Sequence, residues 1–498
     1  MKKRVTVSDV ISLSEIEKWT KGDIVIIQAR TGDGKSYFSK NILFEHAKAN
    51  NKRILFLVNR SNCYNQFLDE IIQEKKNDFL DIKTYQKLEY DGLCKQVGCN
   101  LTKYDYIICD EFHYFLNDST FNDKTDVSFD QIMQNNNSVK IFMSATGQNM
   151  GRYIKENIKL YINPESIKII NYNLPIKFDF VKKLSFFYEE ETFDELIEEF
   201  INQKTKAIFF IQNLEEAYEL YKRHRKYCLF NCGKTNKKFY RHVKKEKISK
   251  MLKDEMFEEL ILITTTCMDS GVNIKDVNLK NIVVHIYDFE TLIQCIGRKR
   301  LLDSDDGINL YVKYPDYRKF GGIKIENDNS IERINYLKTH TAKEYIKEYP
   351  RSAGFDRAIY DLYIEDKDSI TKKINPLIEF KCKLVQEEIK QINLQDKSGY
   401  RKYLLKKLGI RKYEIYEYEK RKRRVYKYLN EINEKTLNKQ EQKILEDIFN
   451  IKDSSGRKYK TIGKFNKYLL ENNFEYEIIR KIIKNKTYWI IVKKEILL

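Results

Sequence analysis

Continuous apolar runs alternate with helix-like stretches along the first third of the chain. The runs lie at 24–27, 54–58, 106–109 and 139–143. Such runs are typical of strands buried on both faces, whereas strands with one wet face alternate polar and apolar residues. The stretch 36–49 has the spacing of a helix. This pattern predicts an α/β domain over 1–163, built on a parallel sheet with helices on both faces.

The same pattern restarts after a connector that contains Pro164 and Pro175. Apolar runs at 207–211, 260–263 and 282–286 predict the strands of a second α/β domain over 164–320.

Beyond residue 320 the strand signal fades, and helical spacing with many Tyr and Lys continues to about residue 435. We expect a mainly helical accessory region over 321–498. Near its end, residues 437–441 open a helix, and an apolar run follows at 488–492. This order favours a small module of the winged-helix kind.

Composition limits the class of protein. A chain of 498 residues is expected to hold two to four domains. Its apolar runs are all shorter than the roughly 18–20 residues that cross a bilayer, so we expect a soluble, cytoplasmic protein. The nine cysteines are scattered. The close pairs Cys94/Cys99 and Cys228/Cys232 lack CxxC spacing. Isolated thiols in a reducing compartment are the favoured interpretation, with a zinc site as the alternative.

Positive charge is concentrated at one end of the chain. The net charge is +18, and residues 401–498 hold 27 Lys and Arg against 13 Asp and Glu. Over 400–428 these cations are interleaved with seven tyrosines. Cations that grip phosphates and rings that stack on bases suit nucleic acid. The alternative is a solvated, lysine-rich helical surface with tyrosines packed in a core.

A phosphate-binding loop is predicted at Ala29–Ser36, which reads ARTGDGKS between a strand and a helix. Gly32 and Gly34 let backbone N–H groups turn toward phosphate oxygens, and the following helix adds its dipole. Lys35 is expected on the β- and γ-phosphates and the Ser36 hydroxyl on Mg²⁺. Ala29 stands where the general motif has its first glycine. The candidate ATP-binding residues of this loop are Thr31, Gly32, Asp33, Gly34, Lys35 and Ser36.

Two adjacent carboxylates follow the strand at 106–109, in the tetrapeptide Asp110-Glu111-Phe112-His113. At the carboxyl end of a strand, Asp110 is expected to hold Mg²⁺ and Glu111 to polarise the attacking water. Acidic residues often end strands, so this tetrapeptide alone is weak evidence for a nucleotide site. Its position downstream of a phosphate loop makes that evidence much stronger.

These motifs resemble, in order, those of superfamily 2 helicases of the DExH kind. Ala29–Ser36 is similar to motif I, Asp110–His113 to motif II, and Ser144-Ala145-Thr146 to the SAT motif that couples hydrolysis to movement. The resemblance implies two tandem RecA-like domains. It also implies nucleic-acid contacts by Thr84 and Gln86 of a Thr-Tyr-Gln sequence, and by Arg60 after Asn59.

The second α/β domain continues the resemblance. Residues 264–274 resemble motif V, which implies a nucleic-acid contact for Thr265 and nucleotide contacts for Gly271 and Asn273. Residues 294–300, QCIGRKR, resemble motif VI, with Gln294, Arg298 and Arg300 as candidate catalytic residues. An arginine from a second domain can neutralise charge on the γ-phosphate, so hydrolysis depends on domain closure.

The spacing of motif VI narrows the resemblance and leaves one point open. Many relatives read QxxGRxxR, whereas the second arginine arrives one residue early here, as Arg300 before Leu301. This shorter form resembles the origin-binding-type helicases of viruses, bacteria and mobile elements. Whether Arg300 contacts phosphate is open at this stage.

Taken together, the motifs over residues 20–315 predict an ATP-dependent helicase or translocase that uses ATP and Mg²⁺. DNA is favoured over RNA as the track, with a single strand in the groove, and replication or repair proteins are expected partners. The alternatives are an RNA helicase or remodeller, and a P-loop binding or signalling ATPase without a nucleic-acid track. Paired motifs in two domains argue against the last class, because a P-loop switch needs only one such domain.

Overall fold

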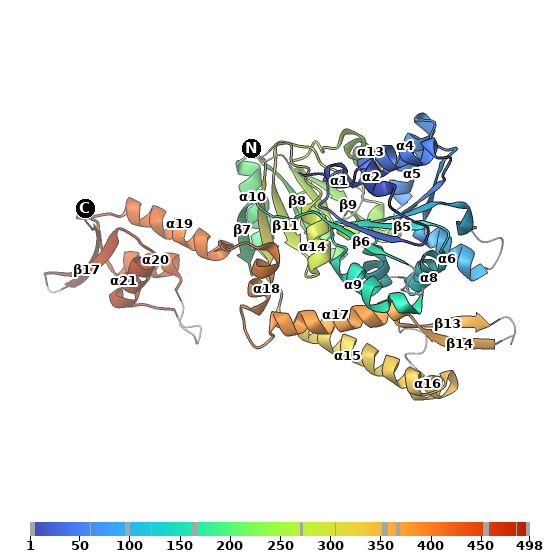
Figure 1. Ribbon diagram of the computed structural model, residues 1–498. Helices are drawn as coiled ribbons and strands as arrows, with labels where there is room; N and C mark the ends of the chain where they lie inside the picture. The colour runs from blue at the N-terminus through green and yellow to red at the C-terminus, as the bar shows by residue number, and fades with distance from the viewer. Residues whose placement is uncertain are drawn as a thin grey trace. The chain divides into compact units, whose positions relative to one another are not determined.

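A computed structural model describes residues 5–59, 61–94, 100–120, 122–161, 167–268, 272–303, 305–350, 357–364, 369–451, 458–484 and 486–494. The chain forms two compact units (Figure 1). Unit 1 comprises Met1–Lys182 and Ile197–Arg411, and unit 2 comprises Lys183–Leu196 and Lys412–Leu498. None of the helices among these described residues is long and apolar enough to cross a membrane.

The first α/β domain of unit 1 is built on a six-stranded sheet in the order β3-β2-β4-β5-β1-β6. All of its strand pairs are parallel, as the apolar runs predict. The strands are β1 (Ile24–Gln28), β2 (Ile54–Val58), β3 (Leu80–Thr84), β4 (Tyr106–Asp110), β5 (Val139–Ser144) and β6 (Ile169–Asn173). Because the strands are parallel, the loops after β1, β4 and β5 meet at one edge of the sheet.

Helices cover both faces of this sheet. They are α1 (Val7–Val10), α2 (Leu13–Ile16), α3 (Lys35–Tyr37), a π-helical stretch (Phe38–Leu43), α4 (Phe44–Ala49), α5 (Ser61–Gln73), α6 (Tyr85–Cys94), α7 (Tyr114–Asn117), α8 (Thr125–Gln134) and α9 (Gln148–Asn157). Three short 3₁₀ turns lie at Leu101–Lys103, Asp118–Thr120 and Ile158–Leu160.

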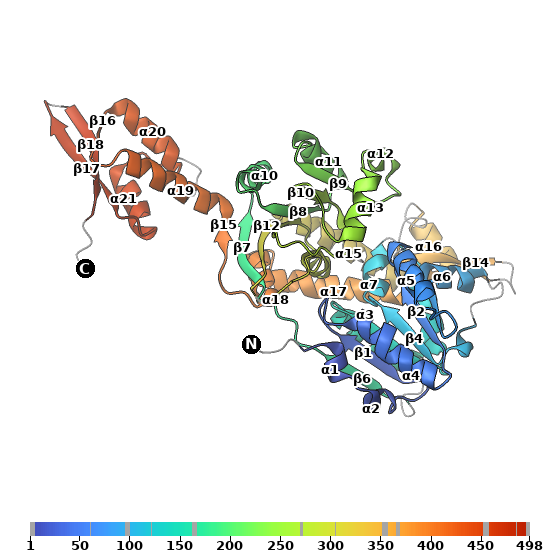
Figure 2. The same ribbon diagram turned by 90° about the horizontal axis from the view of Figure 1, so that it is seen from above.

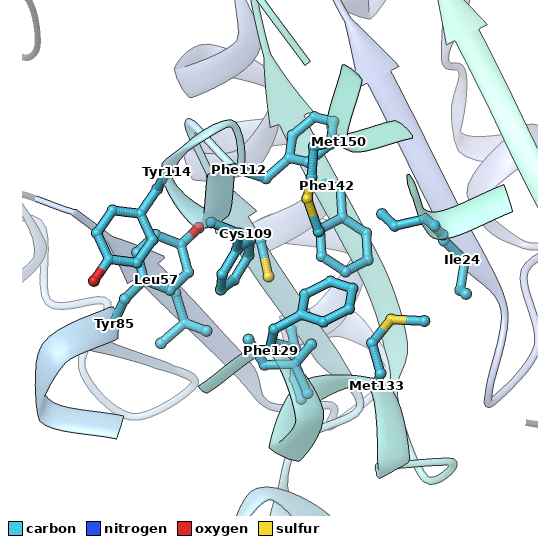
Figure 3. Close-up of a cluster of buried hydrophobic side chains, with 14 of the residues drawn as sticks. Ile24, Leu57, Tyr85, Cys109, Phe112, Tyr114, Phe129, Met133, Phe142 and Met150 are labelled. Carbon is cyan, nitrogen blue, oxygen red and sulfur yellow. The ribbon is translucent and has the colours of Figure 1, made fainter. Parts of the chain in front are cut away.

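The central strand β1 shows why its sequence is apolar throughout. Ile24 and Ile26 belong to one buried cluster, while Val25 and Ile27 belong to the other, on the opposite face. In the first cluster, Phe112 packs against Phe142 with ring centroids 5.5 Å apart (Figure 3). A strand with a core on each side has no wet face, which removes the alternation.

Strand β6 lies beyond residue 163, the expected end of the first domain. It pairs with β1 in parallel, from Ile24 opposite Ile169 to Gln28 opposite Asn173. The first sheet therefore continues past Pro164, the first of the two prolines in the connector. The sequence of β6, IINYN, gives little sign of this, because it is short and half polar.

The second α/β domain is built on a second parallel sheet. Within unit 1 its strands lie in the order β12-β11-β8-β10-β9. They are β8 (Lys206–Ile211), β9 (Cys228–Asn231), β10 (Ile261–Thr264), β11 (Leu279–His285) and β12 (Ile308–Lys313). The helices of this domain are α10 (Thr192–Asn202), α11 (Leu214–Arg223), α12 (Lys237–Tyr240), α13 (Lys245–Asp254), a 3₁₀ turn (Thr266–Met268) and α14 (Phe289–Ile296). The two sheets confirm a tandem pair of RecA-like domains.

A helical arm follows and remains in unit 1. Its elements are α15 (Tyr317–Thr339), α16 (Ala342–Glu348), the antiparallel hairpin β13 (Ile359–Ile364) and β14 (Ser369–Ile374), α17 (Pro376–Ile392) and α18 (Gly399–Leu408). Asn375 caps α17 by accepting from the N–H groups of Leu377 and Ile378. The ring of Phe380 in α17 then packs edge-on against Tyr153 of α9, at 5.2 Å. The expected accessory region 321–498 is thus divided, and only its last part lies in unit 2.

Unit 2 contains a winged-helix arrangement (Figure 2). Its elements are β7 (Val181–Phe187), β15 (Glu414–Ile415), α19 (Tyr416–Glu431), β16 (Thr436–Leu437), α20 (Lys439–Phe449), α21 (Ile462–Glu471), β17 (Tyr476–Ile483) and β18 (Lys486–Lys493). From α19 onward the order is helix, strand, two helices and a hairpin, and the sheet order is β16-β18-β17. Val425, Phe449, Phe465 and Ile478 lie in one buried core that joins these elements.

Candidate active site

A cavity of about 410 Å³ lies between the two RecA-like domains of unit 1. The first domain contributes the phosphate loop and the two adjacent carboxylates, and the second contributes the ends of its motif V and motif VI segments. The lining residues are Arg30, Thr31, Gly32, Gly34, Lys35, Ser36, Asp110, Glu111, Ala145, Ile176, Phe178, Phe180, Asn273, Lys275, Ile293, Ile296, Gly297, Lys299, Arg300 and Leu301. The structure therefore brings together most of the residues predicted to bind ATP.

The phosphate loop has the backbone conformation that its glycines permit. Gly32 and Gly34 have φ angles of +89° and +84°, in the left-handed region that side chains disfavour. Lys35 is buried, and its ammonium donates to the carbonyl oxygens of Ala29 at 2.8 Å and Arg30 at 3.4 Å. Burial lowers the pKa of Lys35, while the carboxylates of the neighbouring motif act in the opposite direction.

Asp33 has a different position from the rest of the loop. It is buried, its N–H donates to the Arg30 carbonyl at 3.0 Å, and its own carbonyl accepts from the Val7 N–H at 2.9 Å. It is not among the residues that line the cavity. Asp33 thus stabilises the loop conformation without lining the cavity, and its hydrogen bond with Val7 connects the loop to helix α1.

Asp110 and Glu111 line the same cavity as Lys35. Burial and the adjacent Glu111 charge raise the pKa of Asp110 to about 7. Burial alone would also raise the pKa of Glu111, but the hydrogen bond to His113 and the charge of Lys35 outweigh it and hold this pKa low. Glu111 adopts a φ of +49°, an unfavourable angle for a side-chain-bearing residue. The hydroxyl of Tyr85 holds the strand end by donating to the Asp110 carbonyl at 2.8 Å.

Ser144 links the SAT motif to the carboxylate motif. Its hydroxyl donates to a Glu111 carboxylate oxygen at 3.1 Å and lies 2.8 Å from His113 Nδ1. The Thr146 N–H donates back to the Ser144 hydroxyl at 3.0 Å. A shift of the SAT segment would therefore move the hydrogen bonds that orient Glu111.

The SAT motif also makes a direct contact with the second domain. The side-chain amide of Gln294, in α14, donates to the Thr146 hydroxyl at 2.9 Å, and the contact is buried. Gln294 in turn accepts from Arg298 twice, through its carbonyl oxygen at 2.8 Å and its side-chain oxygen at 3.2 Å. Motif VI is thereby connected to motif II through two hydroxyl groups.

The two arginines of motif VI occupy different positions. Arg298 is 2% exposed, donates to the Val272 carbonyl at 3.1 Å, and does not line the cavity. Arg300 lines the cavity and donates to the Asn273 side chain at 2.8 Å. The arginine that arrives one residue early in the sequence is thus the one that faces the phosphate loop in this conformation.

The candidate nucleic-acid residues lie at strand ends, away from the cavity lining. The Gln86 side chain donates to the Asn59 carbonyl at 3.1 Å, which places the ends of β2 and β3 together. The Thr84 hydroxyl accepts from the Lys87 N–H at 3.1 Å and so caps α6. Thr265 directly follows β10 in the second domain. Arg60 and Gly271 lie outside the described residues.

One side of the cavity is lined by aromatic side chains that the sequence analysis does not predict. Ile176, Phe178 and Phe180 line it from the connector between the two sheets. The guanidinium of Arg30 lies 5.2 Å from the centre of the Phe180 ring and donates to the Lys177 carbonyl at 3.4 Å. The alternation of apolar residues after Pro175 is the available signal, but it equally fits a short edge strand.

The donor atoms in the cavity fit a magnesium ion. Ser36 and Asp110 offer hydroxyl and carboxylate oxygens, which are the hard ligands that Mg²⁺ prefers alongside phosphate oxygens. In the part of the chain that the structure describes, no group of three or more His, Cys, Asp or Glu is arranged to hold a metal. Cys228 and Cys232 are both buried.

Comparison with known proteins agrees with this geometry. Residues 7–149 match the family model described as "Type III restriction enzyme, res subunit", and the match lies within the first domain. No curated protein matches the chain.

Several solved structures are similar to this chain at low sequence identity. The chain is similar to Saccharomyces cerevisiae Dbp5 bound to RNA and ADP BeF3, at 16% identity, over 61% of this chain and 82% of that one, with a TM-score of 0.45. A DEAD box protein from Methanococcus jannaschii is similar at 21% identity, over 61% and 86%, with a TM-score of 0.35. The helicase MrfA, bound to DNA and AMPPNP, is similar at 17% identity, over 66% and 48%, with a TM-score of 0.42.

The two RecA-like domains and their shared cavity define the class of P-loop proteins with a paired-domain nucleotide site. Within that class, the order of the motifs resembles that of superfamily 2 helicases, and residues 7–149 match the family model named above.

Proposed function

We propose that this protein is an ATP-dependent helicase or translocase in which both RecA-like domains complete one ATP site. The observation that carries the proposal is the Gln294–Thr146 hydrogen bond at 2.9 Å, beside a cavity lined by Lys35 and Arg300. A P-loop switch without a track needs no second domain of this kind. The domain assignments that follow are a first RecA-like domain ending near β6, a second one ending near residue 320, and the accessory elements beyond it.

The residues of the first domain have separate parts in ATP hydrolysis. Lys35 exchanges the carbonyls of Ala29 and Arg30 for phosphate oxygens when ATP enters. Glu111, kept ionised by His113 and Lys35, orients and polarises the attacking water. Ser36 and Asp110 hold Mg²⁺, which supplies charge neutralisation on the phosphates when bound.

The second domain supplies positive charge and senses the reaction. Arg300, held by Asn273, faces the phosphate loop and stabilises charge that develops on the γ-phosphate. Arg298 acts behind it by fixing the side chain of Gln294. Loss of the γ-phosphate changes the contacts of Glu111, and Ser144 and Thr146 transmit that change to Gln294.

DNA is the favoured track. The support is the excess of cations in residues 401–498 and the resemblance of motif VI to origin-binding-type helicases. A single strand is expected across the strand ends that carry Thr84, Gln86 and Thr265, and Arg60, which lies outside the described residues, stays an expected contact from the sequence. Replication or repair proteins are the expected partners. An RNA helicase or remodeller is the second candidate.

An ATPase assay with a panel of nucleic acids tests this proposal. Single- and double-stranded DNA and RNA of one sequence are added in turn to the full-length protein. Stimulation by DNA supports the proposal, and stimulation by RNA alone supports the second candidate. ATP hydrolysis that none of the four nucleic acids stimulates would contradict a motor and favour a binding or signalling ATPase.

A further inference from the structure

Two stretches of unit 2 are rich in cations. Residues 454–470, which end in α21, hold five Lys or Arg and no Asp or Glu. Residues 478–494, which form most of the β17–β18 hairpin, hold six Lys or Arg and again no Asp or Glu. Two neighbouring elements of this unit therefore present positive charge.

Helix α21 has one buried face and one exposed face. Phe465, Tyr468 and Leu469 lie in the core of unit 2, whereas Lys464 and Lys467, three residues apart, are exposed. Residues at this spacing lie on the same side of a helix. The helix thus presents two lysines from its first two turns away from the core. Lys467 lies 3.7 Å from Glu471 in an exposed ion pair, which contributes little energy and leaves the lysine accessible.

The hairpin has the same division between its faces. Ile478 and Ile491 face each other in the core, and the alternation of a strand places Lys481 on the opposite face. Lys481 pairs with Tyr488, and Lys486 stands two residues along on the same face. At the base of the hairpin, Glu475 and Glu477 pair with Lys493 and Lys494, at 3.3 and 3.5 Å. The uncompensated charge therefore lies toward the tip.

One side chain fixes the helix and the hairpin to each other. The Asn466 amide donates to the Ile478 carbonyl at 2.9 Å, and its oxygen accepts from the Ile478 N–H at 2.8 Å. This pair of bonds joins α21 to the first strand of the hairpin, so the two cationic elements lie side by side. We call Lys464, Lys467, Lys481 and Lys486 the wing surface.

We propose that the wing surface binds double-stranded DNA, with α21 in the major groove and the hairpin on the phosphate backbone. The second helix of a helix-turn-helix pair, here α21 after α20, enters the major groove of B-form DNA, which is wide enough for a helix. The major groove of duplex RNA is deep and narrow and does not admit one. The inference rests on the proposed function. If the protein is a helicase or translocase on DNA, unit 2 binds the duplex on which it acts.

The test measures binding of the full-length protein without nucleotide to a duplex DNA, its single strand and the matching RNA duplex. The variants are Lys464→Ala/Lys467→Ala in α21 and Lys481→Ala/Lys486→Ala in the hairpin. The matched control is Arg423→Ala/Lys427→Ala, which removes two exposed cations from α19 in the same unit. We expect each wing-surface variant to lose about tenfold or more in duplex-DNA affinity, and the control less than about twofold.

The salt dependence gives a second readout. Each lost phosphate contact lowers the slope of log affinity against log salt by about 0.9. Equal losses in the control variant, or equal losses on single strands and on duplex RNA, would overturn the proposal. The hairpin variant keeps the test decisive if the α21 variant fails to fold, because its lysines are exposed and outside the core. DNA-stimulated ATP hydrolysis by the wild type, measured separately, shows whether the motor function itself holds.

Discussion

The side chain of Gln294 donates a hydrogen bond to the hydroxyl of Thr146 at 2.9 Å, and this contact joins the two RecA-like domains behind the ATP cavity. Thr146 is in turn one hydrogen bond from Ser144, whose hydroxyl contacts Glu111. A residue of the second domain is therefore three hydrogen bonds away from the carboxylate that is expected to orient water.

We expect Thr146→Val to uncouple the domains, because it keeps the shape of the side chain and removes the hydroxyl. Nucleic-acid stimulation of ATP hydrolysis should fall about tenfold, with a smaller change in unstimulated hydrolysis. Thr146→Ser retains the hydroxyl and serves as the control. In a double-mutant cycle with Gln294→Ala, additive losses would show that the two residues do not act through this contact.

Lys35→Ala should abolish ATP hydrolysis and weaken ATP binding, because Lys35 is the only lysine of the phosphate loop sequence. The unfolding temperature should change little, since the lost bonds are two contacts within the loop. The exposed Lys48→Ala in α4 is the control. Unchanged turnover in Lys35→Ala would remove the loop from the mechanism.

The two arginines of motif VI should differ when each is changed to alanine. Arg300→Ala should lower kcat by about 100-fold and leave ATP binding nearly unchanged, because its charge acts in the transition state. Arg298→Ala should also weaken hydrolysis more than binding, but it should in addition lower the unfolding temperature. Its three buried hydrogen bonds to Gln294 and Val272 are lost. If the two variants lost the same amount in kcat and in unfolding temperature, the assignment of Arg298 to a buried position and Arg300 to the cavity would be contradicted.

Phe180→Ala should raise KM for ATP by about tenfold with a small effect on kcat. The Phe180 ring lines the cavity and is stacked with Arg30, as expected for a surface that receives a nucleobase. Phe180→Leu keeps apolar bulk without the ring. Its KM for ATP should lie between those of the wild type and Phe180→Ala. A KM that is the same for ATP and for the triphosphate lacking its base, in the wild type, would contradict this assignment.

Glu111→Gln should leave ATP bound but unhydrolysed, with a loss in kcat of at least about 100-fold. The amide keeps the size of the side chain and its contact with Ser144, and it removes the negative charge that His113 and Lys35 stabilise. Nucleotide binding measured by titration should stay within a few-fold of wild type. A large loss of binding would instead assign Glu111 a role in holding the nucleotide.

The sequence predicts the parts of the fold that a local pattern encodes. Ile24–Ile27 are apolar because β1 has a core on both faces, and the glycines of the loop stand where positive φ is required. The polar strand β6 and the aromatic wall at Phe178 and Phe180 have no such signature. Their positions depend on which distant strand or domain they meet, so only the folded chain shows them.

The same limit applies to the site. Sequence spacing names Gln294, Arg298 and Arg300 as a group, yet it does not decide which arginine faces the phosphate loop. That choice depends on hydrogen bonds made after folding, to Val272 for one and Asn273 for the other.

Unit 2 is assembled from two separate stretches of the chain, 183–196 and 412–498. Glu417 accepts from the N–H groups of Tyr188 and Glu189, and β15 pairs with β7, so the first stretch depends on the second. Removing everything after residue 411 would therefore strip strand β7 of a partner and leave an unpaired edge open to aggregation. The polypeptide also passes between the two units three times, at residues 182–183, 196–197 and 411–412. Unit 2 is therefore connected to unit 1 by three chain crossings and not by a single linker.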